Sequence, residues 1–182
     1  MSSAYVIVSS TGVTRPFSLR GYAGASGRLD VIARSILALS LEPSSLLYAL
    51  LLGPPGPPKV IVAPPSCCIG LTELEIMAEI SRALKRGEGD WVQVREQGAE
   101  ELLYQLSKQY ELVLLEERGR NALKERWLIA GRKAMILGSH VDMPPEVLAL
   151  ARRYARASIS VGPRSLHADH VIAFLAWLRS QA

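Results

Sequence analysis

Two charged residues, Arg28 and Asp30, lie at the start of a predicted helix, and their types and spacing could act on a nucleotide. A guanidinium can bind a phosphate or the edge of a base, and a carboxylate can accept a hydrogen bond from a nucleobase N–H. The pair also has a simpler interpretation. A carboxylate in the first turn stabilises the positive end of a helix dipole, and an arginine beside it can stay in solvent. The spacing alone leaves both interpretations open.

The three histidines, His140, His167 and His170, are further candidates for chemistry. His167 and His170 are three residues apart in a predicted helix and should face the same side. A zinc site would usually place its helical ligands at i and i+4 and add a third ligand in a conventional motif, and the sequence has neither. We therefore expect no bound metal. The histidines are expected to line a pocket or hold loop carbonyls, and plain core or surface roles stay open.

The common nucleotide-binding and hydrolase motifs are absent from the sequence. It has neither GxxxxGK[ST] nor a GxGxxG between a strand and a helix. The run from Gly53 to Pro58 contains too much proline to offer consecutive backbone donors to phosphates. GxSxG is also missing, which disfavours a nucleophile-elbow hydrolase. If the protein binds a ligand, we therefore expect the binding site to be a pocket lined by backbone groups.

Three apolar segments in the second half of the chain are predicted strands, and each closes near a glycine. They are residues 112–115 before Gly119, 133–137 before Gly138 and 158–161 before Gly162, with a helix at about 145–156. This order is typical of a parallel α/β sheet, in which ligands bind at the carboxyl ends of strands. Because glycine lets backbones approach closely, the three ends predict one pocket with backbone walls.

The remaining elements complete an α/β fold that we expect to be one domain, residues 1–182. Strands are predicted at 5–9, 44–53, 59–63 and 91–94, and helices at about 28–37, 71–85, 98–108 and 165–180. The two strands around the proline-rich turn should form a hairpin. Ser26 is the expected N-cap of its helix, and Thr72 with Glu75 matches a capping box. The last helix is apolar on more than one side, which predicts a second subunit.

The chain of 182 residues carries a net charge of +4, with a pI near 9.3. Basic residues cluster in segments 118–133 and 152–156, which suits a phosphate backbone, although solvated faces explain them as well. No run reaches the ~18 apolar residues that a membrane helix needs. The only cysteines, Cys67 and Cys68, are adjacent, where a disulfide would be strained. We expect a cytoplasmic protein without a membrane partner.

Four segments taken together resemble one family. They are GASGRLDVIARSI (24–36), LLYALLLGPPGPPKV (46–60), ILGSHVDMP (136–144) and SISVGPRSLHADHVIAFL (158–175). In this order they look like the archaeal tRNA pseudouridine-54 N1-methyltransferases of the SPOUT superfamily of α/β-knot methyltransferases, over about residues 5–177. The resemblance implies a parallel-sheet α/β fold with a C-terminal trefoil knot and a homodimer that uses the last helix. It implies S-adenosylmethionine as cofactor and tRNA as substrate.

The implied reaction is methyl transfer to N1 of a pseudouridine, whose N–H must lose its proton before it is a good nucleophile. Asp30 is then the first candidate to orient or deprotonate the base, and Arg28 to bind phosphate or stabilise developing negative charge. His167 or His170 would shape the pocket. By position, the resemblance places the cofactor contacts on Leu115, Gly138, Ile159, Ser160, Val161, Gly162, Pro163, Leu166 and Val171.

The chain departs from the family pattern at three positions. Ser139 stands where the family often has aspartate, Val171 where it often has cysteine, and Ser26 where it tends to have cysteine. The first two departures motivate an alternative in which a knot protein binds RNA without catalysis. A second alternative keeps the enzyme class and changes the target to another nucleotide, in ribosomal RNA. A zinc hydrolase is a third.

Overall fold

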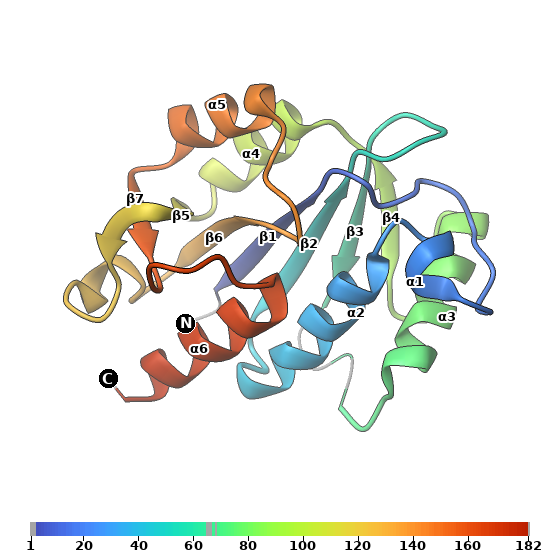
Figure 1. Ribbon diagram of the computed structural model, residues 1–182, viewed down its shortest axis with the longest axis horizontal. Helices are drawn as coiled ribbons and strands as arrows, with labels where there is room; N and C mark the ends of the chain where they lie inside the picture. Colours follow the sequence, from blue (N-terminus) through green and yellow to red (C-terminus); the bar gives the residue numbers. More distant parts are fainter. Residues whose placement is uncertain (1–2, 65–66, 68, 182) are drawn as a thin grey trace.

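The computed structural model describes residues 3–64, 67 and 69–181. In this part of the chain, seven strands form one sheet in the order β4-β3-β2-β1-β6-β5-β7 (Figure 1). The strands are β1 (Ala4–Ser9), β2 (Leu46–Leu51), β3 (Lys59–Ala63), β4 (Gln93–Glu96), β5 (Glu111–Asn121), β6 (Lys133–Gly138) and β7 (Ala157–Ser160).

The sheet is mixed, which corrects the expectation of a parallel sheet. Neighbouring strands from β2 through β1, β6 and β5 to β7 pair in parallel, as predicted. β3 runs antiparallel to both β2 and β4. The physical reason is the proline-rich turn between β2 and β3, which sends the chain straight back as a hairpin. A parallel neighbour would have needed a long crossover.

Helices cover both faces of the sheet (Figure 1). One face carries α1 (Tyr22–Ala25), α2 (Leu29–Ala38), α3 (Glu73–Arg86) and α6 (Ala168–Ser180), with the 3₁₀ turn η1 (Leu39–Leu41) after α2. The other face carries α4 (Ala99–Ser107) and α5 (Pro145–Tyr154), and a second 3₁₀ turn, η2 (Arg126–Leu128), lies between β5 and β6. α2 lies between α6 and α3 and packs against both.

The central strand β1 shows why this sequence forms a two-sided core. Every residue of β1 is buried. Tyr5 and Ile7 pack into the cluster under α2 and α6, while Val6 and Val8 pack into the cluster under α4 and α5. Because successive strand side chains point to opposite faces, a strand covered on both faces must be apolar throughout.

One local prediction about a helix start is confirmed and one is wrong. In the capping box of α3, the Glu75 N–H donates to Thr72 Oγ1 at 3.3 Å, and the Thr72 N–H donates to Glu75 Oε2 at 2.7 Å. The N-cap of α2 is Arg28 and not Ser26, because the left-handed turn at Gly27 and Arg28 delays the first helical residue to Leu29. The Ser26 hydroxyl still accepts the Leu29 N–H at 3.0 Å, so it satisfies one of the free donors at the start of α2.

Several element boundaries differ from the predictions. β5 extends to Asn121 through a bulge in which Ile159 pairs with both Leu115 and Arg120. Gly119 therefore lies inside the strand and not beyond its end. A Cβ at Gly119 would lie 2.4 Å from the carbonyl carbon of Ile159, so this glycine permits close approach of β5 to β7. The last helix begins at Ala168, later than expected, because residues 161–167 form a loop.

Within the described residues, no helix is both long and apolar enough to span a membrane. Cys67 is half-buried, and Cys68 lies outside the described residues. Most large apolar residues of α6 are buried and face the sheet. Trp177 is an exception, because 53% of its surface is exposed.

Candidate functional site

A tight turn sets Arg28 at the start of α2. Gly27 and Arg28 both have left-handed backbone conformations, with φ of 65° and 69°, and Arg28 is the one non-glycine residue with positive φ in the described chain. A Cβ at Gly27 would lie 1.9 Å from the Thr11 carbonyl oxygen, so only glycine fits there. The Thr11 hydroxyl donates to the Gly27 carbonyl at 2.8 Å. Such strain at a non-glycine residue is concentrated at functional sites.

The two sequence-predicted catalytic residues are in contact. Arg28 binds Asp30 through two hydrogen bonds, Nε to Oδ1 at 2.9 Å and Nη2 to Oδ2 at 3.0 Å. Arg34 adds a third, Nη1 to Oδ2 at 2.9 Å. Burial favours the neutral acid, but the hydrogen bonds from the two arginines outweigh it and lower the pKa of Asp30. Asp30 is therefore an ionised and weak base.

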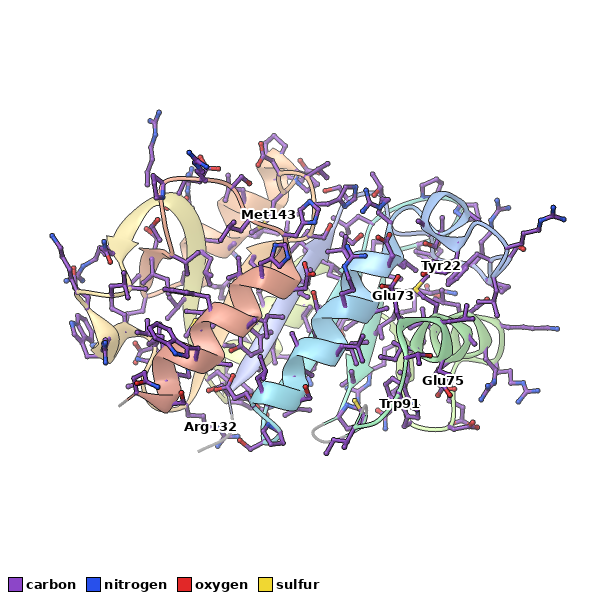
Figure 2. The ribbon with its side chains drawn as sticks, turned by 60° about the horizontal axis from the view of Figure 1, so that its bottom comes forward. Tyr22, Glu73, Glu75, Trp91, Arg132 and Met143 are labelled. Atoms are coloured by element: carbon purple, nitrogen blue, oxygen red, sulfur yellow. The ribbon has the colours of Figure 1, made fainter. Side chains whose placement is uncertain are left out.

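Arg34 connects this pair to the last helix. Its Nε donates to Asp169 Oδ2 at 3.2 Å, so α2 and α6 are joined side by side (Figure 2). Sequence reasoning missed both residues. Arg34 could have been found, because it follows Asp30 by four residues on one helix face. Asp169 carries no such signal, since its partner is 135 residues away.

His140 lies beside this cluster, in the loop that follows β6. Its Nδ1 is 3.1 Å from Ser139 Oγ, and its Nε2 is 3.5 Å from the Thr11 hydroxyl. Burial lowers the pKa of His140 below its ordinary value of 6.5, and the positive charge of Arg28 lowers it further. The imidazole is therefore neutral at neutral pH and can accept a proton. Ser139, one of the departures from the family pattern, is placed to orient this ring.

The other two histidines form a stacked pair at the start of α6. Their ring centroids are 6.0 Å apart and their planes differ by 8°. They do share a side, but His167 precedes the helix instead of lying in it. Across the residues that the structure describes, no three His, Cys, Asp or Glu side chains are grouped to hold a metal ion.

Main-chain hydrogen bonds bring the predicted cofactor segments together. The Ser139 N–H donates to the Val8 carbonyl at 3.1 Å, and the Ala168 N–H donates to the Ser139 carbonyl at 3.2 Å. These bonds join the ends of β1 and β6 to the start of α6. On the other side of β6, β5 and β7 are adjacent, and the Ala122 N–H donates to the Ser160 carbonyl at 2.9 Å. β6, β5 and β7 are therefore neighbours in the sheet, with the last residues of β5 beside the end of β7.

The predicted cofactor residues differ in exposure. Ile159 and Val171 are buried, whereas Pro163 and Leu166 are exposed; Leu115, Gly138, Ser160, Val161 and Gly162 are half-buried. The Ser160 hydroxyl donates to the Gly162 carbonyl at 2.9 Å and accepts the Gly162 N–H at 3.2 Å, so it fixes this turn of the loop.

The loop after β7 offers both backbone and apolar surface to a ligand. No atom lies within 4 Å of the position that a Cβ would take at Gly162, so its backbone faces open space. Leu166, which is 45% exposed, offers an uncovered apolar surface in the same loop. A flat adenine ring can pack on aliphatic side chains and hydrogen-bond to main-chain groups, as ligands do at the carboxyl ends of strands.

Comparisons with known proteins identify the family of this chain. The family described as "Putative SAM-dependent RNA methyltransferase" matches residues 1–181. The chain is 42% identical to the tRNA (pseudouridine(54)-N(1))-methyltransferase of Aeropyrum pernix, covering 97% of this chain and 94% of the relative. It is 30% identical to the enzyme of the same name from Methanocella arvoryzae, covering 95% and 96%.

The fold is also similar to a solved structure. Nep1 of Archaeoglobus fulgidus, bound to S-adenosylhomocysteine, superposes with a TM-score of 0.66 at 16% identity, covering 99% of this chain and all of Nep1. At that identity the likeness concerns the fold. The family match over residues 1–181 and the 42% identical relative show that the chain belongs to the family of S-adenosylmethionine-dependent RNA methyltransferases.

Proposed function

We propose that this protein methylates N1 of pseudouridine in tRNA, at position 54. Two relatives that align over nearly the whole chain carry this activity in their names. The observation that carries the proposal is the position of three residues, Arg28, Asp30 and His140. His140 lies in the loop that follows β6, and this loop is joined by a main-chain hydrogen bond to the start of α6, beside the loops proposed to bind the cofactor.

In the proposed reaction, Arg28 and His140 act on the base and the cofactor supplies the methyl group. The cofactor, when bound, supplies an already activated methyl group on its sulfonium. Arg28, whose side chain is 41% exposed, faces the charge that develops when the base loses its N1 proton and stabilises it. Neutral His140 accepts that proton, directly or through a water.

Asp30 orients Arg28. Both of its carboxylate oxygens are already engaged by arginines, and its lowered pKa makes it a poorer proton acceptor than His140. Of the two roles first considered for Asp30, orientation and deprotonation, the contacts favour orientation. Ser139 replaces a family aspartate without removing the support of the neighbouring ring, because its hydroxyl contacts His140 Nδ1.

The cofactor is proposed to bind across the nine residues named from the resemblance, in the loop around Gly138 and the loop after β7. Backbone from Ile159 to Pro163 and the side chains of Leu115 and Leu166 would form its walls, and buried Val171 would back the pocket from α6. A trefoil knot that threads residues 161–167 belongs to this proposal. The adjacency of β6, β5 and β7 supports it.

A homodimer through α6 is also part of the proposal, as is a cytoplasmic location with tRNA. Trp177 is 53% exposed on α6, where it packs its ring near Phe174, with centroids 5.9 Å apart. An exposed tryptophan on a terminal helix suits a subunit contact. All seven strands join one sheet in the described residues, which supports a single methyltransferase domain over 1–182.

The basic segments 118–133 and 152–156 are proposed to hold the RNA backbone. Their side chains are largely exposed, but several already bind carboxylates: Arg152 binds Glu116, Arg153 binds Glu100, and Arg120 binds Glu125. Phosphates would have to compete with these surface pairs. Surface pairs of this kind are weak, about 0–1 kcal/mol each, so the competition is feasible.

The deciding experiment is mass spectrometry of nucleosides from tRNA transcripts, with and without pseudouridine at position 54, after incubation with labelled S-adenosylmethionine. We expect label in N1-methylpseudouridine from the pseudouridylated transcript alone. Label in another nucleotide or in ribosomal RNA would redirect the substrate. Absence of cofactor binding by calorimetry would favour a knot protein that only binds RNA.

A further inference from the structure

A cavity of about 510 Å³ lies on the side of α2 that faces α1 and α3, away from the cofactor loops. Its walls include Leu19, Tyr22, Asp30 and Glu73, with Gly21 and Gly24 at the rim. Its volume is within the range of about 300–1,000 Å³ that is usual for ligand sites. Asp30 belongs both to this wall and to the candidate catalytic cluster, so the cavity adjoins the place where we expect the target base.

Among the described residues, the cavity offers one carboxylate oxygen that has an ion pair but no hydrogen bond. Both Asp30 oxygens are held by arginines, whereas Glu73 uses Oε1 to accept the Tyr22 hydroxyl at 2.7 Å. Its other oxygen, Oε2, has Arg34 Nη1 at 3.8 Å among the described residues, which is longer than a hydrogen bond. The Glu73 side chain is 27% exposed, so Oε2 can be reached from solvent.

The chemistry of the walls selects the ligand. The arginines neutralise Asp30, but the Glu73 carboxylate would repel a phosphate, and it would also repel the two carbonyl oxygens that flank the single N3–H of uracil. An exocyclic amino group, as in adenine, cytosine or guanine, offers two hydrogens, each with at most one ring acceptor beside it, so it donates to a carboxylate with less repulsion. The Tyr22 ring and Leu19 supply a surface on which a flat base can stack.

We propose that this cavity binds the base of the nucleotide next to the target, and that it favours a base with an exocyclic amino group. The inference rests on the proposed function, since it needs RNA at the Arg28 cluster. α1 and α3 would thereby act as specificity elements, while the loops on the far side of α2 hold the cofactor. Figure 2 shows Tyr22 and Glu73 close together beside the start of α2, with Glu75 on another side of α3.

The test uses end-labelled RNA hairpins with one pseudouridine in the loop. The nucleotide on its 5′ side, and then the one on its 3′ side, is varied through the four standard bases. Fluorescence anisotropy gives the Kd of each hairpin, and transfer from labelled S-adenosylmethionine gives turnover. For the wild type, uridine at one of the two positions is expected to weaken binding about tenfold relative to an amino-bearing base.

The Glu73→Gln variant should reverse this preference. Tyr22 would keep its bond to the amide oxygen, so the amide nitrogen would take the place of Oε2 and present a donor to a uracil carbonyl. Glu75→Gln makes the same charge change on the same helix and can still cap it, so it should behave as the wild type. Tyr22→Leu should weaken binding of every hairpin by about the same factor.

The outcomes separate the two proposals. Equal Kd values for all hairpins, or equal effects of Glu73→Gln and Glu75→Gln, would overturn the base subsite even if methylation proceeds. Absence of methyl transfer to any hairpin would overturn the proposed function, and the anisotropy series would still decide the subsite.

Discussion

Two arginine–carboxylate clusters tie α6 to the α2 segment, one near each end of the helices. The site cluster, which consists of Arg28, Asp30, Arg34 and Asp169, lies toward the starts of α2 and α6. The anchor cluster, Tyr5, Glu42 and Arg179, lies at the other end, where Arg179 Nη1 donates to both Glu42 oxygens at 2.6 and 2.8 Å and the Tyr5 hydroxyl donates to Glu42 Oε2 at 2.5 Å.

The clusters share their chemistry and differ in access to solvent. In the anchor cluster, the side chains of Arg179 and Glu42 are 14% and 16% exposed. In the site cluster, Arg28 is 41% exposed and its backbone is left-handed, a conformation that costs roughly 1–2 kcal/mol in a non-glycine residue. A purely structural ion pair needs neither feature. The difference in exposure supports our proposal that the site cluster presents a cation to a ligand, whereas the anchor cluster holds the helices together.

The largest expected effect is on turnover, in the Asp30→Asn variant. An amide cannot hold both Arg28 and Arg34 as the carboxylate does, so Arg28 loses its position. We expect turnover to fall about 10²–10³-fold, as when one preorganised electrostatic group is removed. Cofactor affinity, measured by calorimetry on protein shown to be folded by circular dichroism, should change little. Equal and small effects on turnover and affinity would remove Asp30 from the reaction.

The matched change in the anchor cluster is Arg179→Met, which should act on stability. It leaves the Glu42 carboxylate half-buried without its cation, and we expect a loss of about 3 kcal/mol in the free energy of unfolding, measured with urea. Turnover per folded molecule should be unchanged. If Arg179→Met lowered turnover as much as Asp30→Asn does, the two clusters would not differ in function.

The sequence was informative where a signal is local. The capping box at Thr72 and the bounds of β3 are set by neighbours in the chain, and both were predicted correctly. The strands β5, β6 and β7 were predicted from their apolar runs, although Gly119 lies inside β5 and not at its end. Arg28 and Asp30 were predicted to act together from their place at a helix start, and the structure shows them in contact there.

The sequence was uninformative where a contact spans the fold. The Arg34–Asp169 and Thr11–His140 contacts join residues more than 120 positions apart, and nothing in their local sequence marks them. The bulge in β5 was missed for the same reason, because it is defined by Ile159 on another strand. The start of α6 was predicted too early, because residues 161–167 form a loop before Ala168 that no local signal in the sequence marks.

A smaller effect should follow from Thr11→Val, which tests how the site cluster is held. The variant loses the hydrogen bond to the Gly27 carbonyl, worth about 1 kcal/mol, so turnover should fall about fivefold. Thr11→Ser keeps the hydroxyl and should therefore keep most of the wild-type turnover. Thr14→Val is a control in the same loop, because the Thr14 hydroxyl accepts the Gly56 N–H at 2.9 Å, away from Arg28. It should lower the unfolding free energy without slowing the folded enzyme.

The finest test concerns His140, which lies beside the site cluster, and it is the titration of this residue followed by NMR of its ring C–H signal. The neutral imidazole is the active form in our proposal, so turnover should fall as the pH drops through the His140 pKa, which lies below the ordinary value of 6.5. Arg28→Gln removes a positive charge that lowers this pKa, while Asp30, which raises it, stays in place. The His140 pKa should therefore rise, and the acid limb of the pH–rate profile should move to higher pH. Arg86→Gln makes an equal charge change at the exposed end of α3. It should change neither the His140 pKa nor the acid limb of the pH–rate profile. If His140 titrates identically in both variants, Arg28 does not share its electrostatic environment, and the assignment of the proton acceptor loses its basis.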